Sequence, residues 1–247
     1  MDEFKIEGRN AVIEVLKSDK TINKLMILKG ERQGSMNEII KLAKAKHIII
    51  SEVEKTKLDS LSETKHHQGV IAFVAPIEYK ELDDIFALAK DKNEDPFILI
   101  ADEIEDPHNL GALIRSAECA GVHGVIIPKR RATAVTEVVF KTSVGACEYV
   151  PIVRVNNINE TIRELKDRGV WIVGTDGNAK TMYYDQDYQG SIAIIIGSEG
   201  RGMNKLTMEN CDFLVKIPMM GKITSLNASV SGGIVLFEAL KQRMKKN

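Results

Sequence analysis

The sequence contains little cysteine, one tryptophan and no long hydrophobic run, and each shortage narrows what the protein can be. Its cysteines, Cys119, Cys147 and Cys211, lie far apart without a CxxC spacing, so neither a zinc site nor a disulfide framework is indicated. No stretch of about 18 apolar residues occurs, so we expect no membrane-spanning helix and no membrane partner. The lone Trp171 is expected in the core.

The sequence also lacks an excess of charge of either sign, because its formal net charge is −1. Proteins that bind nucleic acids are usually more basic, so the net charge argues against a nucleic-acid partner, although local basic clusters stay open. The first ten residues, MDEFKIEGRN, are polar and acidic, whereas a secretory signal has a basic stretch followed by an apolar core. We therefore expect a cytoplasmic protein.

What the sequence does contain is an alternation of apolar runs and helical patterns in two parts. Residues 1–76 carry three apolar runs separated by helical patterns, which predicts a small N-terminal αβ domain. Residues 77–96 have little to bury and end in a charged stretch, so we interpret them as a linker, although a surface helix and loop of a single domain also fits. Residues 97–247 alternate short Ile- and Val-rich runs with helices, which predicts an α/β domain with a mostly parallel sheet covered on both faces.

In such a sheet, ligands bind beyond the carboxyl ends of the strands, and four loops of the sequence lie there. The loop DPHNLGALIR supplies Asn109, which is suited to cap the following helix, and Arg115. The loop GTDGNA contains Thr175. The loop GSEGRGM fits neither a dinucleotide-binding fingerprint nor a P-loop, nor the turn around a hydrolase nucleophile. It predicts a backbone that lies very close to something, with the Glu199 carboxylate nearby.

The fourth loop, IPMMGKITSLNASVSGG, places many helix-weakening residues where a long amphipathic helix begins. Ser225 is suited to be the N-cap of that helix, which leaves Asn227, Ser229 and Ser231 unexplained. Free N–H groups at a helix N-terminus suit anionic or carbonyl-like ligand atoms. The pattern therefore favours a ligand site at this loop.

Three ordered motifs within these loops carry a family resemblance. The first is Asn109, Gly111 and Arg115, and the second is Gly197, Glu199 and Gly202. The third consists of Ile217, Pro218, Ser225, Leu226, Asn227 and Ser229. Together they resemble the SpoU (TrmH-like) family of RNA ribose 2′-O-methyltransferases, within the knotted SPOUT superfamily. The segments GVIIPKRR and VGACEYVPIVRV look closest to the RlmB branch, which methylates a guanosine of 23S rRNA.

The resemblance implies S-adenosyl-L-methionine as cofactor, a C-terminal trefoil knot, an N-terminal RNA-binding domain, a homodimer and no metal. The implied catalytic residues are Asn109, Arg115, Glu199, Ser225 and Asn227. The implied cofactor-binding residues are Thr175, Gly197, Ile217 and Leu226. Family accounts make Arg115 the acceptor of the ribose proton, but an arginine is almost never deprotonated in a protein. A fixed positive charge that grips a substrate phosphate is the alternative role.

The implied partner is RNA, and local basic residues are the candidates to hold it. Lys129, Arg130 and Arg131 follow the second predicted strand of the sheet on the same side as the four loops, so we expect them to contact phosphates. The segment 66–68 in the N-terminal part either contributes to RNA binding or forms a polar turn. The expected substrate is a guanosine of 23S rRNA. The alternatives are a tRNA guanosine, or an RNA-binding ribosome-assembly factor without turnover, against which the intact motifs argue.

Overall fold

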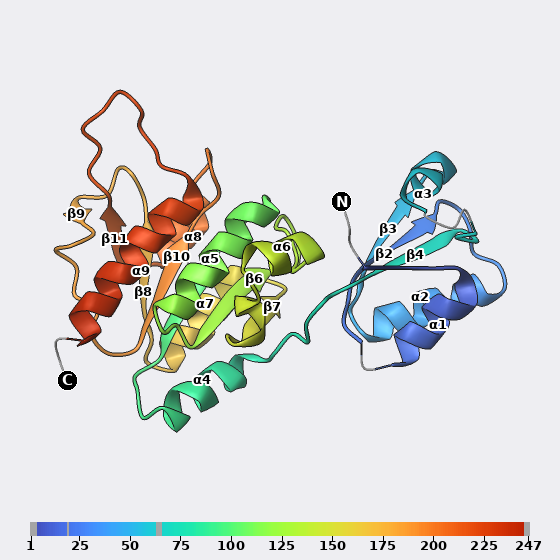
Figure 1. Ribbon diagram of the computed structural model, residues 1–247, viewed down its shortest axis with the longest axis horizontal. Coiled ribbons are helices and arrows are strands. Elements are labelled where there is room, and N and C mark those ends of the chain that lie inside the picture. Colours follow the sequence, from blue (N-terminus) through green and yellow to red (C-terminus); the bar gives the residue numbers. More distant parts are fainter. Residues whose placement is uncertain (1–3, 19, 63–65, 245–247) are drawn as a thin grey trace. The chain divides into compact units, whose positions relative to one another are not determined.

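The computed structural model describes residues 4–18, 20–62 and 66–244 (Figure 1). The chain divides into two compact units. Unit 1 comprises Met1–Glu78 and Val135–Val138, and unit 2 comprises Tyr79–Ala134 and Val139–Asn247. None of the helices in the described ranges has the length and apolar character that a membrane crossing requires.

Unit 1 is built on a four-stranded mixed sheet with the order β1-β4-β2-β3. Strand β4 pairs antiparallel with β1 and β2, whereas β2 and β3 are parallel. The elements are β1 (Phe4–Glu7), α1 (Arg9–Lys17), β2 (Ile22–Leu28), α2 (Ser35–Ala45), β3 (Ile49–Val53), α3 (Lys55–Leu61) and β4 (Val70–Val74). Alternate residues of β4 serve different clusters, because Ala72 joins the core of α1 and α2 while Ile71 and Phe73 pack with Leu58 of α3.

Unit 2 contains a seven-stranded sheet with the order β7-β6-β5-β10-β8-β11-β9, and every strand pair in its described part is parallel. The strands are β5 (Phe97–Ala101), β6 (Gly124–Pro128), β7 (Ile152–Val155), β8 (Trp171–Thr175), β9 (Thr181–Met182), β10 (Ile192–Ile196) and β11 (Phe213–Lys216). Every residue of β5, β6 and β10 is buried, which explains their unbroken apolar runs. The predicted parallel α/β sheet is confirmed.

Helices cover both faces of this sheet. They are α4 (Leu82–Asp91), α5 (Pro107–Cys119), α7 (Ile158–Asp167), α8 (Lys205–Asn210) and α9 (Ala228–Met244). Helix α6 (Glu137–Thr142), whose first two residues belong to unit 1, and a 3-10 turn at Ala146–Glu148 complete the helical elements of this part of the chain. Helices α5 and α9 lie side by side over one face (Figure 1). A Cβ at Gly232 of α9 would lie 2.3 Å from Leu113 Cδ2 of α5, so a larger residue there would displace the Leu113 side chain. Ile85 of α4 and Ile162 of α7 pack in the core of the other face.

The segment 77–96, for which we expected a linker, contains α4. Ile85 and Ala89 of this helix are buried, and a Cβ at Gly124 of β6 would lie 2.3 Å from Ile85 Cγ1. A capping box between Glu81 and Asp84 fixes the start of the helix. The part of this segment from Tyr79 on therefore belongs to unit 2. The charged neighbours of its short apolar stripe concealed the packing of α4.

Trp171 is 56% exposed, so the expectation that it lies in the core is wrong. It begins β8, where the strand enters the sheet from the surface. Its ring lies 5.7 Å from that of Phe213, which begins β11 and is also exposed. Each of these aromatic residues therefore shields the other at the surface.

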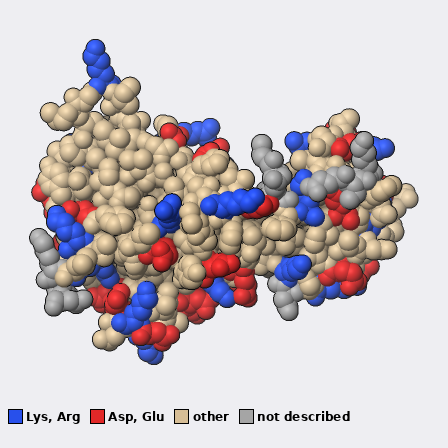
Figure 2. Space-filling model, in the orientation of Figure 1, with Lys and Arg blue, Asp and Glu red and all other residues tan. Residues whose placement is uncertain are grey.

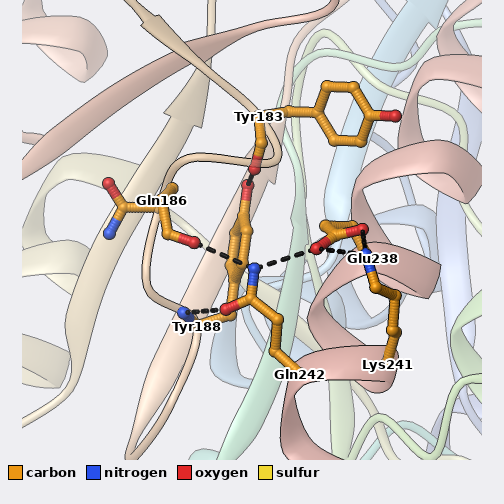
Figure 3. A network of polar contacts seen from close by, with 6 residues as sticks. All are labelled: Tyr183, Gln186, Tyr188, Glu238, Lys241 and Gln242. Carbon is orange, nitrogen blue, oxygen red and sulfur yellow. Dashed lines mark hydrogen bonds and ion pairs between the residues drawn. The ribbon is translucent and has the colours of Figure 1, made fainter.

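The C-terminal half of α9 is fastened to the segment that follows β9 (Figure 3). Gln242 accepts a hydrogen bond from the Tyr188 backbone N–H (3.2 Å) and donates to the Gln186 carbonyl (3.1 Å) and to Glu238 (3.0 Å). Tyr188 is fully buried and its hydroxyl donates to the Tyr183 carbonyl at 2.8 Å. Burial raises the pKa of Tyr188, so it stays protonated as a donor.

Candidate functional site

Three side chains from three separate motifs meet beyond the carboxyl ends of the unit 2 strands. Asn109 Nδ2 donates to Glu199 Oε2 at 3.1 Å, and Asn227 Nδ2 donates to Asn109 Oδ1 at 2.8 Å. A third contact joins Asn227 Nδ2 to Glu199 Oε2 at 3.4 Å. The three elements that supply them follow β5, β10 and β11. We call these three residues the amide–carboxylate network.

Asn109 lies in the first turn of α5, whose N-cap is Asp106 and not Asn109 as expected. Asp106 Oδ1 accepts a hydrogen bond from the Asn109 backbone N–H at 2.8 Å, and Pro107 occupies the first helical position. The cap leaves the Asn109 amide available to the network. A Cβ at Gly111 would lie 2.9 Å from the Val139 carbonyl oxygen, so α6 packs directly on this turn.

Glu199 lies in a tight hairpin that follows β10. Ser198 and Gly202 exchange backbone hydrogen bonds of 3.2 and 2.9 Å, and a Cβ at Gly197 would lie 2.4 Å from Gly202 C and from Met203 N. The close neighbour that the glycines predicted is therefore the hairpin's own backbone. Glu199 is exposed at its end.

Asn227 acts as the side-chain cap of α9, a role that we expected for Ser225. Its Oδ1 accepts hydrogen bonds from Ser229 N (3.0 Å), Ser229 Oγ (2.6 Å) and Val230 N (3.4 Å). Because the oxygen faces the helix, the NH₂ group faces Asn109 and Glu199. The helix terminus thereby fixes the direction of every hydrogen bond in the amide–carboxylate network.

Arg115 and Ser225 do not join this network. Arg115 lies on α5 six residues after Asn109, and its side chain is exposed. Within the described ranges, neither side chain has a hydrogen-bond or ion-pair partner. A guanidinium with five free donors suits a phosphate that arrives with a ligand. The roles of both residues stay predictions.

The four residues expected to bind a cofactor surround the ends of β8, β10 and β11. Thr175 Oγ1 donates to the Ile195 carbonyl at 3.1 Å, and Gly197 begins the hairpin. Ile217 precedes, and Leu226 ends, an exposed loop of residues 218–226, which extends away from the sheet in Figure 1. In this loop Met220 is 98% exposed and Ile223 76% exposed. Apolar side chains exposed next to a polar network are typical of a binding surface.

Asp102 is a buried carboxyl group under the hairpin that sequence reasoning missed. It follows β5, is only 3% exposed, and its backbone N–H donates to the Ile196 carbonyl at 2.9 Å. Burial, and then the charge of Glu103, raise the pKa of Asp102 to about 6, against a smaller opposing effect of the Thr207 hydroxyl. An Asp at the end of a buried strand, just before a motif, was the available signal.

The basic cluster of Lys129, Arg130 and Arg131 follows β6, whose carboxyl end lies at the same edge as the network. Arg131 is paired with Glu103 at 3.6 Å, its side chain remains 81% exposed, and Arg130 is exposed as well. Figure 2 shows that Lys and Arg side chains alternate with Asp and Glu over the face in view. The cluster is therefore a local feature on a mixed surface, in agreement with the net charge.

In unit 1, His67 and Gln68 form a structural turn. His67 is buried, with Nε2 at 2.9 Å from Asp59 Oδ1 and Nδ1 accepting from the Gly69 N–H at 3.0 Å. Gln68 Oε1 accepts from the Arg9 N–H at 3.0 Å, at the start of α1. These polar atoms are used within the unit, which favours the polar-turn interpretation.

Two family models match the chain. The model of the SpoU rRNA Methylase family matches residues 96–237, and that of RNA 2′-O ribose methyltransferase substrate binding matches residues 5–80. YacO of Bacillus subtilis, assigned to the TrmH family of tRNA/rRNA methyltransferases, is 50% identical over 236 residues, which cover 96% of this chain and 94% of that protein.

Solved structures show the same architecture. The SpoU methyltransferase AviRb from Streptomyces viridochromogenes, in complex with the cofactor AdoMet, superposes with a TM-score of 0.63 at 24% identity over 98% of this chain and 91% of its own. The TrmH/SpoU tRNA modifying enzyme of A. aeolicus gives 0.56 at 28% identity, over 62% of this chain and 77% of its own.

Proposed function

The chain belongs to the SpoU/TrmH family of RNA methyltransferases, and on this premise we propose that it methylates the ribose 2′-hydroxyl of a guanosine in 23S rRNA. The methyl donor of the proposed reaction is S-adenosylmethionine, which is the cofactor bound to AviRb. The amide–carboxylate network is the observation that carries the proposal. It brings together one residue from each of the three motifs at the carboxyl edge of a parallel sheet, where such folds bind ligands.

The residues at this edge fit the donor. S-adenosylmethionine combines a flat adenine with polar edges, and it supplies a methyl group on a positively charged sulfur that leaves with the bonding electron pair. Met220, Ile223 and Leu226 offer exposed apolar surface to a base. The backbone at Gly197 and Ile217 offers hydrogen-bonding groups beside it. We assign Thr175, Gly197, Ile217 and Leu226 to cofactor binding on this basis.

The chain's own contribution to catalysis is then mostly positioning and charge. The attacking oxygen must lie opposite the departing sulfur, so a rigidly held ribose lowers the barrier. Asn109 and Asn227 are fixed by the cap of α9 and are suited to hold that ribose, with Ser225 beside them. We propose that Arg115 grips a phosphate next to the target nucleotide as a permanent positive charge.

Unit 1 and the basic cluster provide for the RNA in this proposal. A substrate-binding family model covers residues 5–80, which supports RNA binding by unit 1. Lys129, Arg130 and Arg131 lie at the same edge of the sheet as the network and are suited to phosphate contacts. Because these contacts are electrostatic, RNA affinity should fall steeply as salt increases.

A tRNA guanosine is the second candidate substrate, because the TrmH/SpoU relative from A. aeolicus is a tRNA modifying enzyme. Mapping of ribose methylation in a strain that lacks this protein separates the two. Loss of one 23S rRNA mark supports the proposal, and loss of a tRNA mark replaces it with the second candidate.

A non-catalytic ribosome-assembly factor is the remaining alternative. Calorimetric titration of the purified protein with S-adenosylmethionine tests it, because a pure RNA binder gives no heat of cofactor binding. The homodimer and the trefoil knot implied by the resemblance also stay proposals. Equilibrium sedimentation that shows an active monomer would refute the dimer.

A further inference from the structure

In the amide–carboxylate network, Asn227 and Asn109 supply all the donors, and Glu199 only accepts. The α9 terminus fixes the Asn227 oxygen, so Asn227 Nδ2 donates to Asn109 Oδ1 and to Glu199 Oε2. Because Asn109 Oδ1 is an acceptor there, its Nδ2 must be the atom that donates to Glu199 Oε2. Two amide groups thus donate to a single carboxylate oxygen.

The second oxygen of the carboxylate, Oε1, is left free. Across the described residues, no donor lies within hydrogen-bonding distance of it, although the side chain is held at its other oxygen. The hairpin exposes Glu199 to solvent. An ionised carboxylate accepts hydrogen bonds at both oxygens, so Oε1 is a vacant acceptor in a fixed position.

The other residues assigned to the site cannot accept a proton at neutral pH. Arg115 is a donor only, and its guanidinium stays protonated in proteins. Asn109 and Asn227 are amides without a basic nitrogen, and a serine hydroxyl such as that of Ser225 is itself a weak acid. A carboxylate oxygen can accept a proton, which makes Glu199 the one candidate general base among the five.

We propose that Glu199 is the general base of the reaction and that its Oε1 takes the proton of the target 2′-hydroxyl, an assignment that rests on the proposed function. The O–H bond breaks and its electron pair stays on the ribose oxygen. This oxygen uses a pair to bond the methyl carbon while the bond from that carbon to the donor's sulfur breaks, and the pair of that bond leaves with the sulfur. The proton joins Oε1 and passes to water, because Glu199 is exposed. Arg115 keeps its proton throughout and contributes charge.

The first test is Glu199→Gln, which preserves the volume of the side chain but removes the base. We expect methyl transfer to slow by about 100- to 10,000-fold. The calorimetric dissociation constants for S-adenosylmethionine and for RNA should stay within about threefold, as for a loss of chemistry alone. Glu105→Gln is the matched control, because Glu105 is an exposed glutamate just before α5, and its activity should stay within about twofold of wild type.

The second test is chemical rescue of Glu199→Ala by an added carboxylate. If Glu199 only oriented its neighbours, the added carboxylate would not restore methyl transfer. In Glu199→Ala the missing carboxylate leaves room for formate, and added formate should raise the transfer rate at least tenfold. The same formate should leave Arg115→Ala unchanged. Thermal unfolding of each variant confirms that the hairpin is intact.

The outcomes distinguish a failure of the proposed role of Glu199 from a failure of the proposed methyltransferase function. Transfer by Glu199→Gln within tenfold of wild type, or the absence of formate rescue in Glu199→Ala, overturns the assignment of Glu199 as base. A wild-type protein that transfers no methyl group to RNA ribose refutes the proposed function instead.

Discussion

Two loops at the same edge of the sheet, the hairpin after β10 and the loop of residues 218–226 after β11, use their small residues in opposite ways. The hairpin is closed by backbone bonds between Ser198 and Gly202, and Gly197 has no room for a side chain. In the second loop, Met220 and Ile223 lie in solvent, and a Cβ at Gly221 would meet only ordinary contacts. Contacts within the hairpin determine its conformation, whereas the exposed apolar side chains of the second loop are available to a ligand.

After Glu199, the largest effect on methyl transfer is expected at Asn227, which directly follows the open loop. Asn227→Asp keeps an oxygen to cap α9, but it removes both donors and places a second carboxylate beside Glu199. We expect methyl transfer to fall by about 100- to 1,000-fold, and the free energy of unfolding to change by less than about 1 kcal/mol. Single-turnover kinetics and urea unfolding measure the two. Activity above one-tenth of wild type would show that donation by Asn227 is dispensable.

The comparison between the loops predicts opposite results for their glycines. Gly197→Ala places a Cβ at 2.4 Å from backbone atoms of Gly202 and Met203, so we expect a loss of roughly 2–4 kcal/mol in the free energy of unfolding. Gly221→Ala, the control in the other loop, should stay within about 0.5 kcal/mol. Equal effects in chemical denaturation would remove the distinction between the loops.

The next prediction concerns how the free energy of unfolding depends on the protonation of Asp102. Because its pKa is raised to about 6 in the folded protein, the folded state binds the proton more tightly than the unfolded state. This group's contribution to stability is therefore complete below about pH 4 and is lost as the pH rises through about 6. Asp102→Asn should increase the free energy of unfolding by roughly 1–3 kcal/mol at pH 7.5. It should also reduce the dependence of this free energy on pH between pH 4 and 6. Unfolding midpoints of both proteins at pH 4, 5, 6 and 7.5 provide the check.

The smallest effect on folding is expected at Met220, which is 98% exposed. Met220→Ser should leave the free energy of unfolding within about 0.5 kcal/mol, because no contact is lost. Its affinity for S-adenosylmethionine should fall by about three- to tenfold in calorimetry, since the apolar surface offered to the cofactor is smaller. Unchanged affinity would contradict the assignment of this loop to the cofactor.

The strands and motifs could be predicted because their signals are local. Unbroken apolar runs such as that of β10 identify buried parallel strands, and the motif spacings identify Asn109, Glu199 and Asn227. Their mutual contacts link residues 28, 90 and 118 positions apart, which no local pattern encodes. The same limit concealed Ile85 of α4, whose burial depends on a glycine in a distant strand.

The capping errors have a different origin. Several polar residues compete for each helix start, and only the backbone geometry decides between Asp106 and Asn109, or between Ser225 and Asn227. Trp171 was misplaced because hydrophobicity does not distinguish the first residue of a strand from the middle ones. In each case the sequence predicted the helix or strand itself, but not the place of the individual residue within it.

The anchoring of Gln242 to the segment after β9 makes α9 a stiff rod with one end held. Seventeen residues of helix separate its two ends by about 25 Å, and Asn227 lies just beyond the opposite end. A truncation that removes Gln242, or a bulky fusion at the C-terminal end of α9, would break this anchor. The helix could then shift along its axis or tilt. The disturbance would reach the ribose site without touching any residue in it, so the choice of tag position affects measured turnover.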